Sequence, residues 1–484
     1  MVNQEFPLTA SNPCPQKNML YKTSKLCLLF FLMLSLSVLP SGSTASVFGE
    51  FTLTDEAELG EKVHRLIRAR LDIIDDPEIT LYIQDIAASL EKAAPPQPFP
   101  ITVDVVNHNA VNAFATVAGY MVIFSGLILN VETESELASI MAHELAHITQ
   151  RHVARNIERS KIVSIGTLLG VIAGALIGSD AGGAVAIGSM AGAQSAVLSY
   201  SRDDEREADQ VGLNYLIKAG YNPSGMVSAM RKMRRMQWFS GGDIPSYLST
   251  HPGMDERIGY LSDRIDRLHP DLLNRTDDNS RLKRVQTLIR ARYMDPSTAL
   301  HLFQEKELDP CLAYLGKGIV NIRINRVGEA GKNFEKLIEC DDNDPLFLRE
   351  AGKYYFQFGD LSKAGALLQK AVMLRPGDTQ SLIFYARILN EKGDPETAIS
   401  YLQRCLKTAP EHPMAHEHLA RIYGQNRNNF MAHLHMSYAH IFENNRRQAL
   451  FHKKKARELA MDPKQKDLLD ILDKAYKEQS QFWK

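Results

Sequence analysis

The sequence predicts a mainly α-helical protein with two domains, an α+β domain that carries a small β-sheet and an all-α solenoid. Three observations support this prediction. Segments with the features of helices occupy most of the 484 residues. Three short runs between residues 101 and 125 instead have the features of β-strands. Beyond residue 309, small and apolar residues recur with a constant spacing, which is typical of stacked helical repeats.

The composition is that of an ordinary soluble globular protein, with 44% hydrophobic and 23% charged residues. A chain of 484 residues has room for two or three domains. The net charge of −1 gives no general attraction to nucleic acid or to an anionic membrane. We therefore expect no nucleic-acid partner.

The N-terminal segment, residues 1–45, is predicted to be a signal peptide. Two lysines precede an apolar run at 26–39, and small residues suited to cleavage follow near Ala45. The apolar run is too short to span a bilayer comfortably, although a retained membrane anchor is the alternative. Polar residues are unusual ahead of a signal, which suggests Met19 as the true start. The mature protein is expected outside the cytoplasm.

The five cysteines do not form a disulfide scaffold. Removal of the signal peptide would leave Cys311, Cys340 and Cys405, which is an odd number. A bridge between Cys311 and Cys340 is compatible with an oxidising compartment. Three buried thiols are an equally good interpretation of the same residues.

The first predicted domain, residues 46–270, begins with helices and continues with strands. Helices are expected over 56–71 and 77–93. Strands are expected in the three runs that follow, with a glycine at the turn between the last two, at residues 101–107, 112–117 and 120–125.

A buried helix is predicted to begin just after Thr133, which forms a capping box with Glu136. Further on, residues 162–198 are apolar and rich in Gly and Ala. This composition favours a helical hairpin that is buried or touches a membrane surface, with true membrane spans as the alternative. A polar helix follows from 201, and residues 271–308 are predicted to be linker helices.

The second domain, residues 309–484, is predicted from its repeats. Four positions recur after 34 residues, with Ala364, Leu368, Ala371 and Pro376 matched by Ala398, Leu402, Cys405 and Pro410. This period, with small residues where helices cross, is the tetratricopeptide pattern. We expect an insertion near 424–440 before a last, out-of-phase repeat. Such repeats stack into a concave surface that binds other chains.

The helix that follows Thr133 carries a candidate metal site. His143 and His147 are four residues apart, so both imidazoles lie on one face and can reach one ion. Glu144 lies beside them, where it can take a proton from an attacking water. On a continuous helix His152 would point away from this face, so we expect a structural role for it.

A third ligand is needed, and the polar helix that begins near residue 201 offers one. Glu205 and Asp209 are four residues apart on a face shared with small and apolar residues. Glu205 fits as the third ligand. Asp209 fits further out, where it would bind a ligating imidazole. The neighbouring acidic residues are expected to be solvated, namely Asp203, Asp204 and Glu207.

The motif HELAH followed by EREAD resembles the paired motifs of the HtpX/Ste24 family of zinc peptidases. The resemblance implies one Zn²⁺ per chain, held by His143, His147 and Glu205, with Glu144 as the catalytic base and Asp209 beside the ligands. With the signal peptide and the repeats, the whole chain resembles periplasmic family members that are both protease and chaperone. This implies an endopeptidase that degrades misfolded or stalled outer-membrane proteins and assists their assembly. The repeats would then contact the assembly machinery.

The resemblance also implies roles for two further segments. His251, which precedes a proline in a loop, would be a regulatory fourth ligand. A zinc closed by four protein ligands cannot present a reactive water. The alternative is that His251 only packs the turn. Extended substrate would add to an edge strand formed by Asn112, Ala113, Phe114 and Ala115.

Two other functions remain open from the sequence. In one, the repeats bind or chaperone other proteins and the protease site is largely silent. In the other, the chain is an integral membrane protease that spans the bilayer through 162–198.

Overall fold

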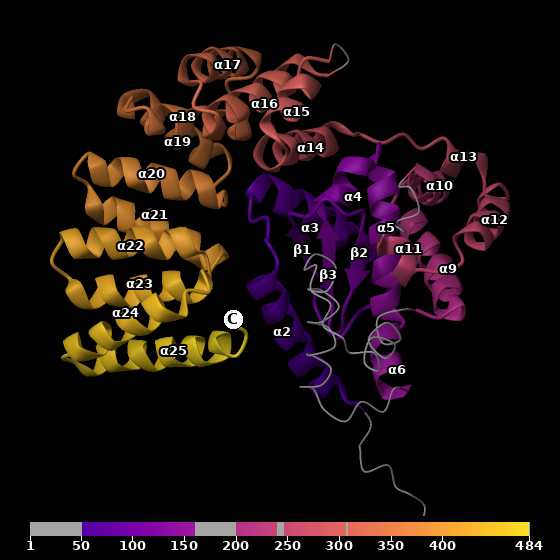
Figure 1. Cartoon of the computed structure of the whole chain (residues 1–484), viewed down its shortest axis with the longest axis horizontal. Coiled ribbons are helices and arrows are strands. Elements are labelled where there is room, and N and C mark those ends of the chain that lie inside the picture. Colours follow the sequence, from indigo (N-terminus) through magenta and orange to yellow (C-terminus); the bar gives the residue numbers. More distant parts are fainter. Residues whose placement is uncertain (1–50, 160–199, 240–245, 306–307, 484) are drawn as a thin grey trace, which may run out of the picture. The chain divides into compact units, whose positions relative to one another are not determined.

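The computed structural model describes four stretches of the chain, namely residues 51–159, 200–239, 246–305 and 308–483 (Figure 1). The predicted signal peptide and the apolar segment 162–198 lie outside the described residues. Within them, no helix combines the length and the apolar character needed to cross a membrane.

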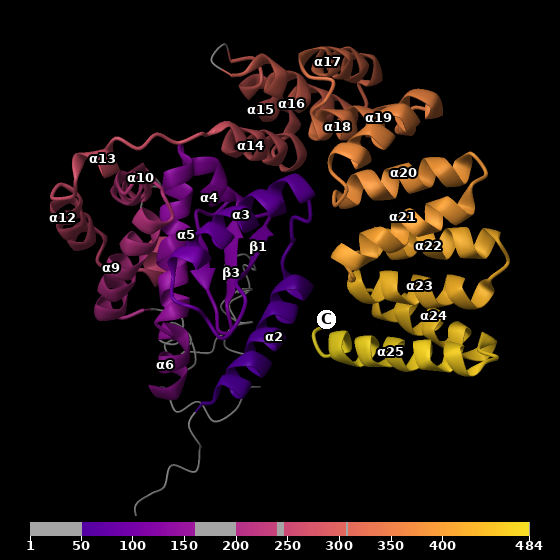
Figure 2. The ribbon, with the colours of Figure 1, turned by 180° about the vertical axis from the view of Figure 1, so that it is seen from behind.

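Helices dominate the first part of the chain (Figures 1 and 2). Their bounds are α2 (Leu53–Arg70), α3 (Pro77–Ala93), α4 (Ser125–Asn130), α5 (Glu134–Thr149), α6 (His152–Arg159), α9 (Arg202–Lys218), α10 (Ser224–Phe239), α11 (Ser246–Thr250), α12 (Met254–Ile265) and α13 (Pro270–Leu273). The first two confirm the helices expected over 56–71 and 77–93.

Helix α5 begins where the sequence predicted, because the Thr133 side chain accepts a hydrogen bond from the Glu136 backbone N–H. The return bond of a capping box is absent. The Glu136 carboxylate instead accepts from the backbone N–H of Glu132 and from Lys232 of α10, both at 2.7 Å. Glu136 therefore joins α5 to α10.

The three expected strands form one sheet in the order β1–β3–β2, with bounds β1 (Thr102–Val106), β2 (Ala113–Ala115) and β3 (Tyr120–Phe124). Strands β1 and β3 are parallel, whereas β2 and β3 are antiparallel. The turn between β2 and β3 contains Gly119, whose φ of 83° suits glycine. Strand β2 lies at an edge of the sheet.

Both faces of the sheet are covered, so its strands alternate between two apolar clusters. Val105, Ala113 and Ile123 pack in the cluster that contains α3 and α5. Val106 and Val122 face the other way, toward α2 and α6. This period of two follows from strand geometry.

The region expected to link the two domains contributes to the core. It forms α14 (Ser280–Tyr293) and α15 (Pro296–Leu302). Leu282 and Leu288 of α14 are fully buried. The Gln286 side chain donates hydrogen bonds to the carbonyls of Ile128 and Val131, at 2.9 and 2.8 Å. Helix α14 therefore packs against the end of α4.

The remaining helices form consecutive antiparallel pairs (Figure 2). Their bounds are α16 (Pro310–Arg323), α17 (Val327–Cys340), α18 (Pro345–Gln357), α19 (Leu361–Leu374), α20 (Thr379–Glu391), α21 (Pro395–Thr408), α22 (Pro413–Gln425), α23 (Asn429–Phe442), α24 (Arg446–Leu459) and α25 (Pro463–Ser480). A small sheet in a mainly helical first part, followed by helical repeats, confirms the predicted fold class.

The turn inside each pair shows the repeat most directly. A left-handed residue occurs every 34 positions, at Asn325, Gly359, Gly393 and Arg427. The insertion expected near 424–440 is therefore wrong. Those residues form most of α23, in phase with the earlier repeats, and Arg427 occupies the turn position that is glycine at 359 and 393.

The structure also decides the pairing of the cysteines. A disulfide joins Cys311 of α16 to Cys340 of α17. Cys405 of α21 is free and fully buried among apolar residues. The bridge between Cys311 and Cys340 is therefore confirmed, and the interpretation of three buried thiols is wrong, since only Cys405 is a buried thiol.

Candidate metal centre

Helix α5 presents His143, Glu144 and His147, which are all buried. Because one helical turn separates the two histidines, their Nε2 atoms meet at 3.0 Å. Buried polar side chains need hydrogen-bonding or ionic partners, and here the partners come from other helices.

Helix α9 crosses α5 and supplies a carboxylate. Glu205 is 1% exposed, and its two oxygens lie 3.5 Å from His143 Nε2 and 3.4 Å from His147 Nε2. Burial alone would raise the pKa of Glu205, but His251 and Arg257 hold it well below its usual range. Glu205 is therefore an anionic ligand candidate.

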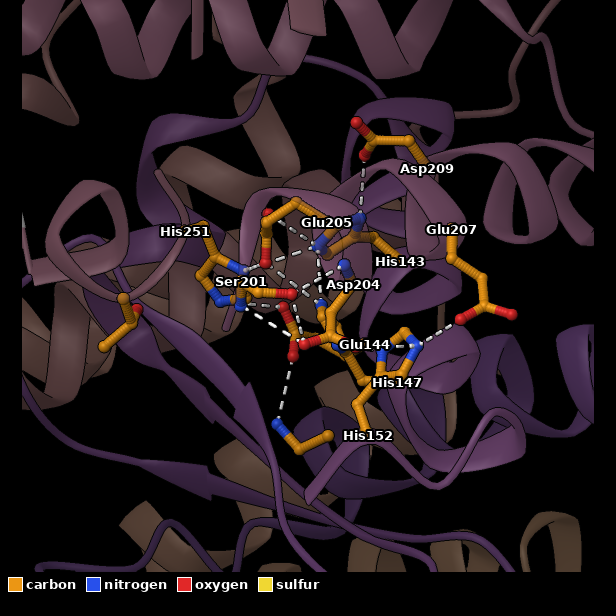
Figure 3. A network of polar contacts seen from close by, with 12 residues as sticks. His143, Glu144, His147, His152, Ser201, Asp204, Glu205, Glu207, Asp209 and His251 are labelled. Atoms are coloured by element: carbon orange, nitrogen blue, oxygen red, sulfur yellow. Dashed lines mark hydrogen bonds and ion pairs between the residues drawn. The ribbon is translucent and has the colours of Figure 1, made fainter. Parts of the chain in front are cut away.

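His251 completes the group from the loop after α11. Its Nδ1 atom lies 2.8 Å from a Glu205 oxygen and 3.4 Å from His143 Nε2 (Figure 3). Four ligands at zinc–ligand distances near 2.1 Å in a tetrahedron would be about 3.4 Å apart. The donor atoms of His143, His147, Glu205 and His251 are thus spaced to hold one small cation.

Unsatisfied atoms in this cluster support the same conclusion. Glu144 Oε1 and His251 Nε2 are buried and make no hydrogen bond with any described residue. They lie 3.5 Å apart. Buried polar atoms of this kind are rare in folded proteins, and they are expected where an ion or a reacting molecule is absent. These two atoms leave a place for a reacting molecule beside the donors, and the spacing of the four donors fits a metal ion.

Glu144 lies between the candidate ligands and the edge strand, with Oε1 toward His251 and Oε2 toward β2. The Ala115 backbone N–H of β2 donates a hydrogen bond of 3.0 Å to Glu144 Oε2. Residues 112, 114 and 116 pair with β3, so the N–H and C=O groups of Ala113 and Ala115 point to the edge that no described strand covers, although both residues are buried. This edge of β2 is therefore in contact with the candidate catalytic base. Burial also raises the pKa of Glu144, with His251 and His143 opposing the change.

Asp209 holds His143 from behind the cluster. Its Oδ1 atom lies 2.9 Å from His143 Nδ1, which is the contact expected from the sequence. Arg257 of α12 donates two hydrogen bonds to Asp209, at 2.8 and 2.7 Å, and also pairs with Glu205. Burial would raise the pKa of Asp209, but Arg257 and His143 lower it to about 2. Tyr260 donates a further hydrogen bond to Asp209.

Two tyrosine rings enclose the histidines. The Tyr200 ring stacks on His147 with centroids 3.6 Å apart, and the Tyr247 ring stacks on His251 at 4.2 Å. Both tyrosines are buried. They restrict the rotation of the rings that they cover and exclude water from those faces.

Two expectations about neighbouring residues are wrong. His152 does not point away, because α5 ends at Thr149 and a new helix begins at His152. His152 is fully buried, and its Nδ1 atom lies 2.7 Å from His147 Nδ1. Asp204 and Glu207 are not simply solvated: Asp204 is buried, and Glu207 pairs with His152 at 2.9 Å. Asp203 is exposed, as expected.

The sequence did not indicate the roles of Arg257, Tyr200, Tyr247 or Tyr260. None of them has a fixed spacing from the ligands, and the crossing of α9, α11 and α12 decides their contacts. The segment that carries His251 gave a partial indication of the role of Arg257, because Arg257 follows His251 closely in the sequence.

Two segments of the chain match known families. Residues 74–265 match peptidase family M48, and residues 355–422 match the tetratricopeptide repeat. The first part of this protein is therefore an M48 metallopeptidase domain, and helical repeats follow it. The resemblance to a zinc peptidase family is confirmed at this level.

Several curated proteins are similar to this chain over much of its length. The beta-barrel assembly-enhancing protease of Escherichia coli is 27% identical, over 75% of this chain and 74% of that protein. A Vibrio cholerae protein provisionally given the same name is 32% identical, over 61% of this chain and 63% of its own length. The mitochondrial metalloendopeptidase OMA1 of Arabidopsis thaliana is 34% identical over 33% of this chain and 30% of that protein. The chain thus spans less than two thirds of the Vibrio protein.

Proposed function

We propose that this protein is a zinc-dependent endopeptidase in which His143, His147 and Glu205 hold the metal. The spacing of the three donors supports this assignment, and so does the anionic state of Glu205. Two histidines and a glutamate are also a common ligand set of catalytic zinc. When bound, the metal supplies Lewis-acid polarisation of the substrate carbonyl.

Glu144 moves the proton in this reaction. Its Oε2 atom is held by the Ala115 N–H, whereas Oε1 makes no hydrogen bond with any described residue and faces the cluster. Oε1 takes a proton from the attacking water and later passes it to the leaving amine. The raised pKa of Glu144 suits this role, because a stronger base accepts the proton more readily.

Substrate binds as an added strand on the free edge of β2, the segment that contains Asn112, Ala113, Phe114 and Ala115. The outward N–H and C=O groups of Ala113 and the outward C=O of Ala115 would pair with an extended peptide. The Ala115 N–H is already bonded to Glu144 Oε2. Because Ala115 also contacts Glu144, a peptide in this register passes directly beside the catalytic base. Asp209 acts indirectly, by holding the His143 ring through Nδ1.

His251 keeps the site closed until substrate or a partner displaces it. Its Nδ1 atom lies close enough to the other donor atoms to bind the same ion, and the residue is fully buried. With four protein ligands, no position remains for water or a carbonyl oxygen. The protein is then a latent protease, and this observation also favours the alternative in which the repeats bind clients while the protease site is largely silent.

The substrates are misfolded or stalled outer-membrane β-barrel proteins, and the site of action is the periplasm. The name of the E. coli and Vibrio relatives supports the substrate class, and the predicted signal peptide at residues 1–45 supports the compartment. The domains are residues 46–270 and 309–484. The repeats would present unfolded chains or bind the assembly machinery. Peripheral membrane contact through residues 162–198 is part of the same hypothesis.

The contact between Ala115 and Glu144 is the observation that carries this proposal, since it joins a free strand edge to the base. The test compares Glu144→Gln with wild type in cleavage of an unfolded β-barrel protein. We expect a loss of about 100- to 10,000-fold in cleavage rate. Glu158→Gln, an exposed glutamate on α6, is the matched control and should cleave normally. The same comparison is made in the His251→Ala background, where the site is open, and equal cleavage with and without Glu144→Gln there would reject the protease assignment.

A second experiment tests the closed state. His251→Ala should cleave faster than wild type and retain bound zinc, because three ligands remain. Unchanged or lower cleavage with full zinc content would reject the gating role. The alternative function would be favoured if wild type prevents aggregation of the β-barrel substrate while neither wild type nor His251→Ala cleaves it.

A further inference from the structure

Both ring nitrogens of His152 are engaged, although this residue is not one of the candidate ligands. Nδ1 lies 2.7 Å from His147 Nδ1, and Nε2 lies 2.9 Å from the Glu207 carboxylate (Figure 3). Arg155 Nη2 donates a hydrogen bond of 2.8 Å to the same Glu207 oxygen. A continuous chain of polar contacts thus runs from the candidate metal centre to an arginine near the surface.

Metal binding assigns the protons along this chain. If His147 coordinates through Nε2, the atom that faces Glu205, then its Nδ1 must carry the proton. His147 Nδ1 therefore donates to His152 Nδ1. The proton of neutral His152 is then on Nε2, which donates to the Glu207 carboxylate. Every donor in this chain has an acceptor.

The backbone is arranged to make this contact possible. On an uninterrupted helix His152 would be rotated by roughly 140° from His147 and could not reach it. The break occurs at Arg151, whose φ of 52° is unusual for a residue with a side chain. Glu56 of α2 holds the Arg151 side chain with hydrogen bonds of 3.0 and 2.8 Å. The ion pair between Arg151 and Glu56 of α2 therefore holds this strained turn in place.

His152, Asp204 and Glu207 could in principle hold a second cation, because their donor atoms lie close together. The contacts argue against that role. His152 Nδ1 already faces His147, and Arg155 already supplies a positive charge 2.8 Å from Glu207 and 3.7 Å from Asp204. The group is therefore satisfied without an ion.

We propose that His152 is a positioning residue that orients the His147 ring and fixes its proton on Nδ1, with Glu207 fixing the tautomer of His152 in turn. A hydrogen-bonded partner of this kind typically raises metal affinity by about 10- to 100-fold. This inference rests on the proposed metal site.

The test measures the Zn²⁺ affinity of the metal-free full chain by competition with a chromophoric chelator. His152→Leu fills similar space but can neither accept nor donate, so its affinity should fall by at least about 10-fold. His152→Gln keeps one acceptor and one donor and should restore most of that loss. The Co²⁺ absorption spectrum should change in His152→Leu and not in His152→Gln. His418→Leu, a buried histidine of α22, is the matched control and should bind as wild type does.

Each outcome has one meaning. His152→Leu with wild-type affinity would overturn the proposal, and so would His152→Gln that binds as weakly as His152→Leu, since shape alone would then matter. If His152→Leu does not fold, Glu207→Ala decides, because Glu207 is 41% exposed and its loss is tolerable. Glu207→Ala should weaken Zn²⁺ binding several-fold, and unchanged affinity would reject the chain of contacts. Absence of Zn²⁺ binding by wild type would instead reject the proposed metal site itself.

Discussion

Gly212 of α9 lies directly against Ala142 of α5, at the point where the two ligand-bearing helices cross. A Cβ atom on Gly212 would be 2.9 Å from the Ala142 carbonyl oxygen and 3.1 Å from the Cα atom of His143. No neighbouring side chain can move to relieve this contact, because both atoms belong to the backbone. The approach of Glu205 to His143 therefore depends on a residue without a side chain.

Gly212→Ala should separate α5 from α9 and weaken metal binding. We expect a loss of about 1–3 kcal/mol in unfolding free energy, as for other overpacked core sites, together with lower Zn²⁺ affinity. Gly259→Ala in α12 is the matched control, since its Cβ would meet nothing within 4 Å. That control should be neutral or slightly stabilising, because alanine favours a helix. Equal behaviour of the two variants in urea unfolding and zinc titration would contradict the prediction.

Arg257 should be essential for the stability of the metal-free protein. It is 3% exposed and pairs with both Glu205 and Asp209, so Arg257→Met leaves two buried carboxylates without their cation. The expected cost is roughly 3–5 kcal/mol, measured by urea unfolding in the presence of a chelator. Arg264→Met on the same helix loses only neutral partners, including Asn214 at 2.7 Å, and should cost less than about 1 kcal/mol. Comparable losses in both variants would show that the carboxylates do not depend on Arg257.

The bridge between Cys311 and Cys340 should stabilise the first helical pair of the repeats. It closes a loop across 29 residues, which corresponds to about 3–4 kcal/mol in the chain-entropy description. A reductant should lower the melting temperature of wild type. The same reductant should have no effect on a variant with Cys311→Ala and Cys340→Ala, which still contains the free Cys405. A reductant effect that persists in the double variant would assign the stabilisation elsewhere.

The repeats should lose stability as the solution becomes acidic. Burial lowers the pKa of His416 and of His418 to about 4, and that of His435 to about 3. The unfolded chain protonates these residues near pH 6.5, so between about pH 6.5 and 4 it binds more protons than the folded chain. Stability is fully present above pH 6.5 and falls by up to about 1.4 kcal/mol per histidine and pH unit below it.

His418→Leu tests this prediction, because it removes one of the titrating groups. Unfolding free energies between pH 7.5 and 5 should fall less steeply for this variant than for wild type. Parallel pH profiles for His418→Leu and wild type would contradict the assigned shift.

Local patterns in the sequence were sufficient for much of this protein. The spacing of His143 and His147 depends only on helical geometry, so their shared face was predictable. The 34-residue period is likewise local, and the prediction from it failed near 424–440, where Arg427 occupies the turn position that is glycine at 359 and 393. Glu205 and Asp209 were found because a pair of carboxylates on an apolar helix face needs partners wherever that helix packs.

The tertiary structure alone decided which residues surround those ligands. His152 was misjudged because a single left-handed residue, Arg151, ends the helix, and its conformation is held by Glu56 nearly one hundred residues earlier in the chain. Arg257 and Tyr247 reach the centre only through the packing of α11 and α12. Helical periodicity predicts the direction of a side chain within one helix, whereas contacts between helices depend on how distant segments pack, and no local pattern encodes that.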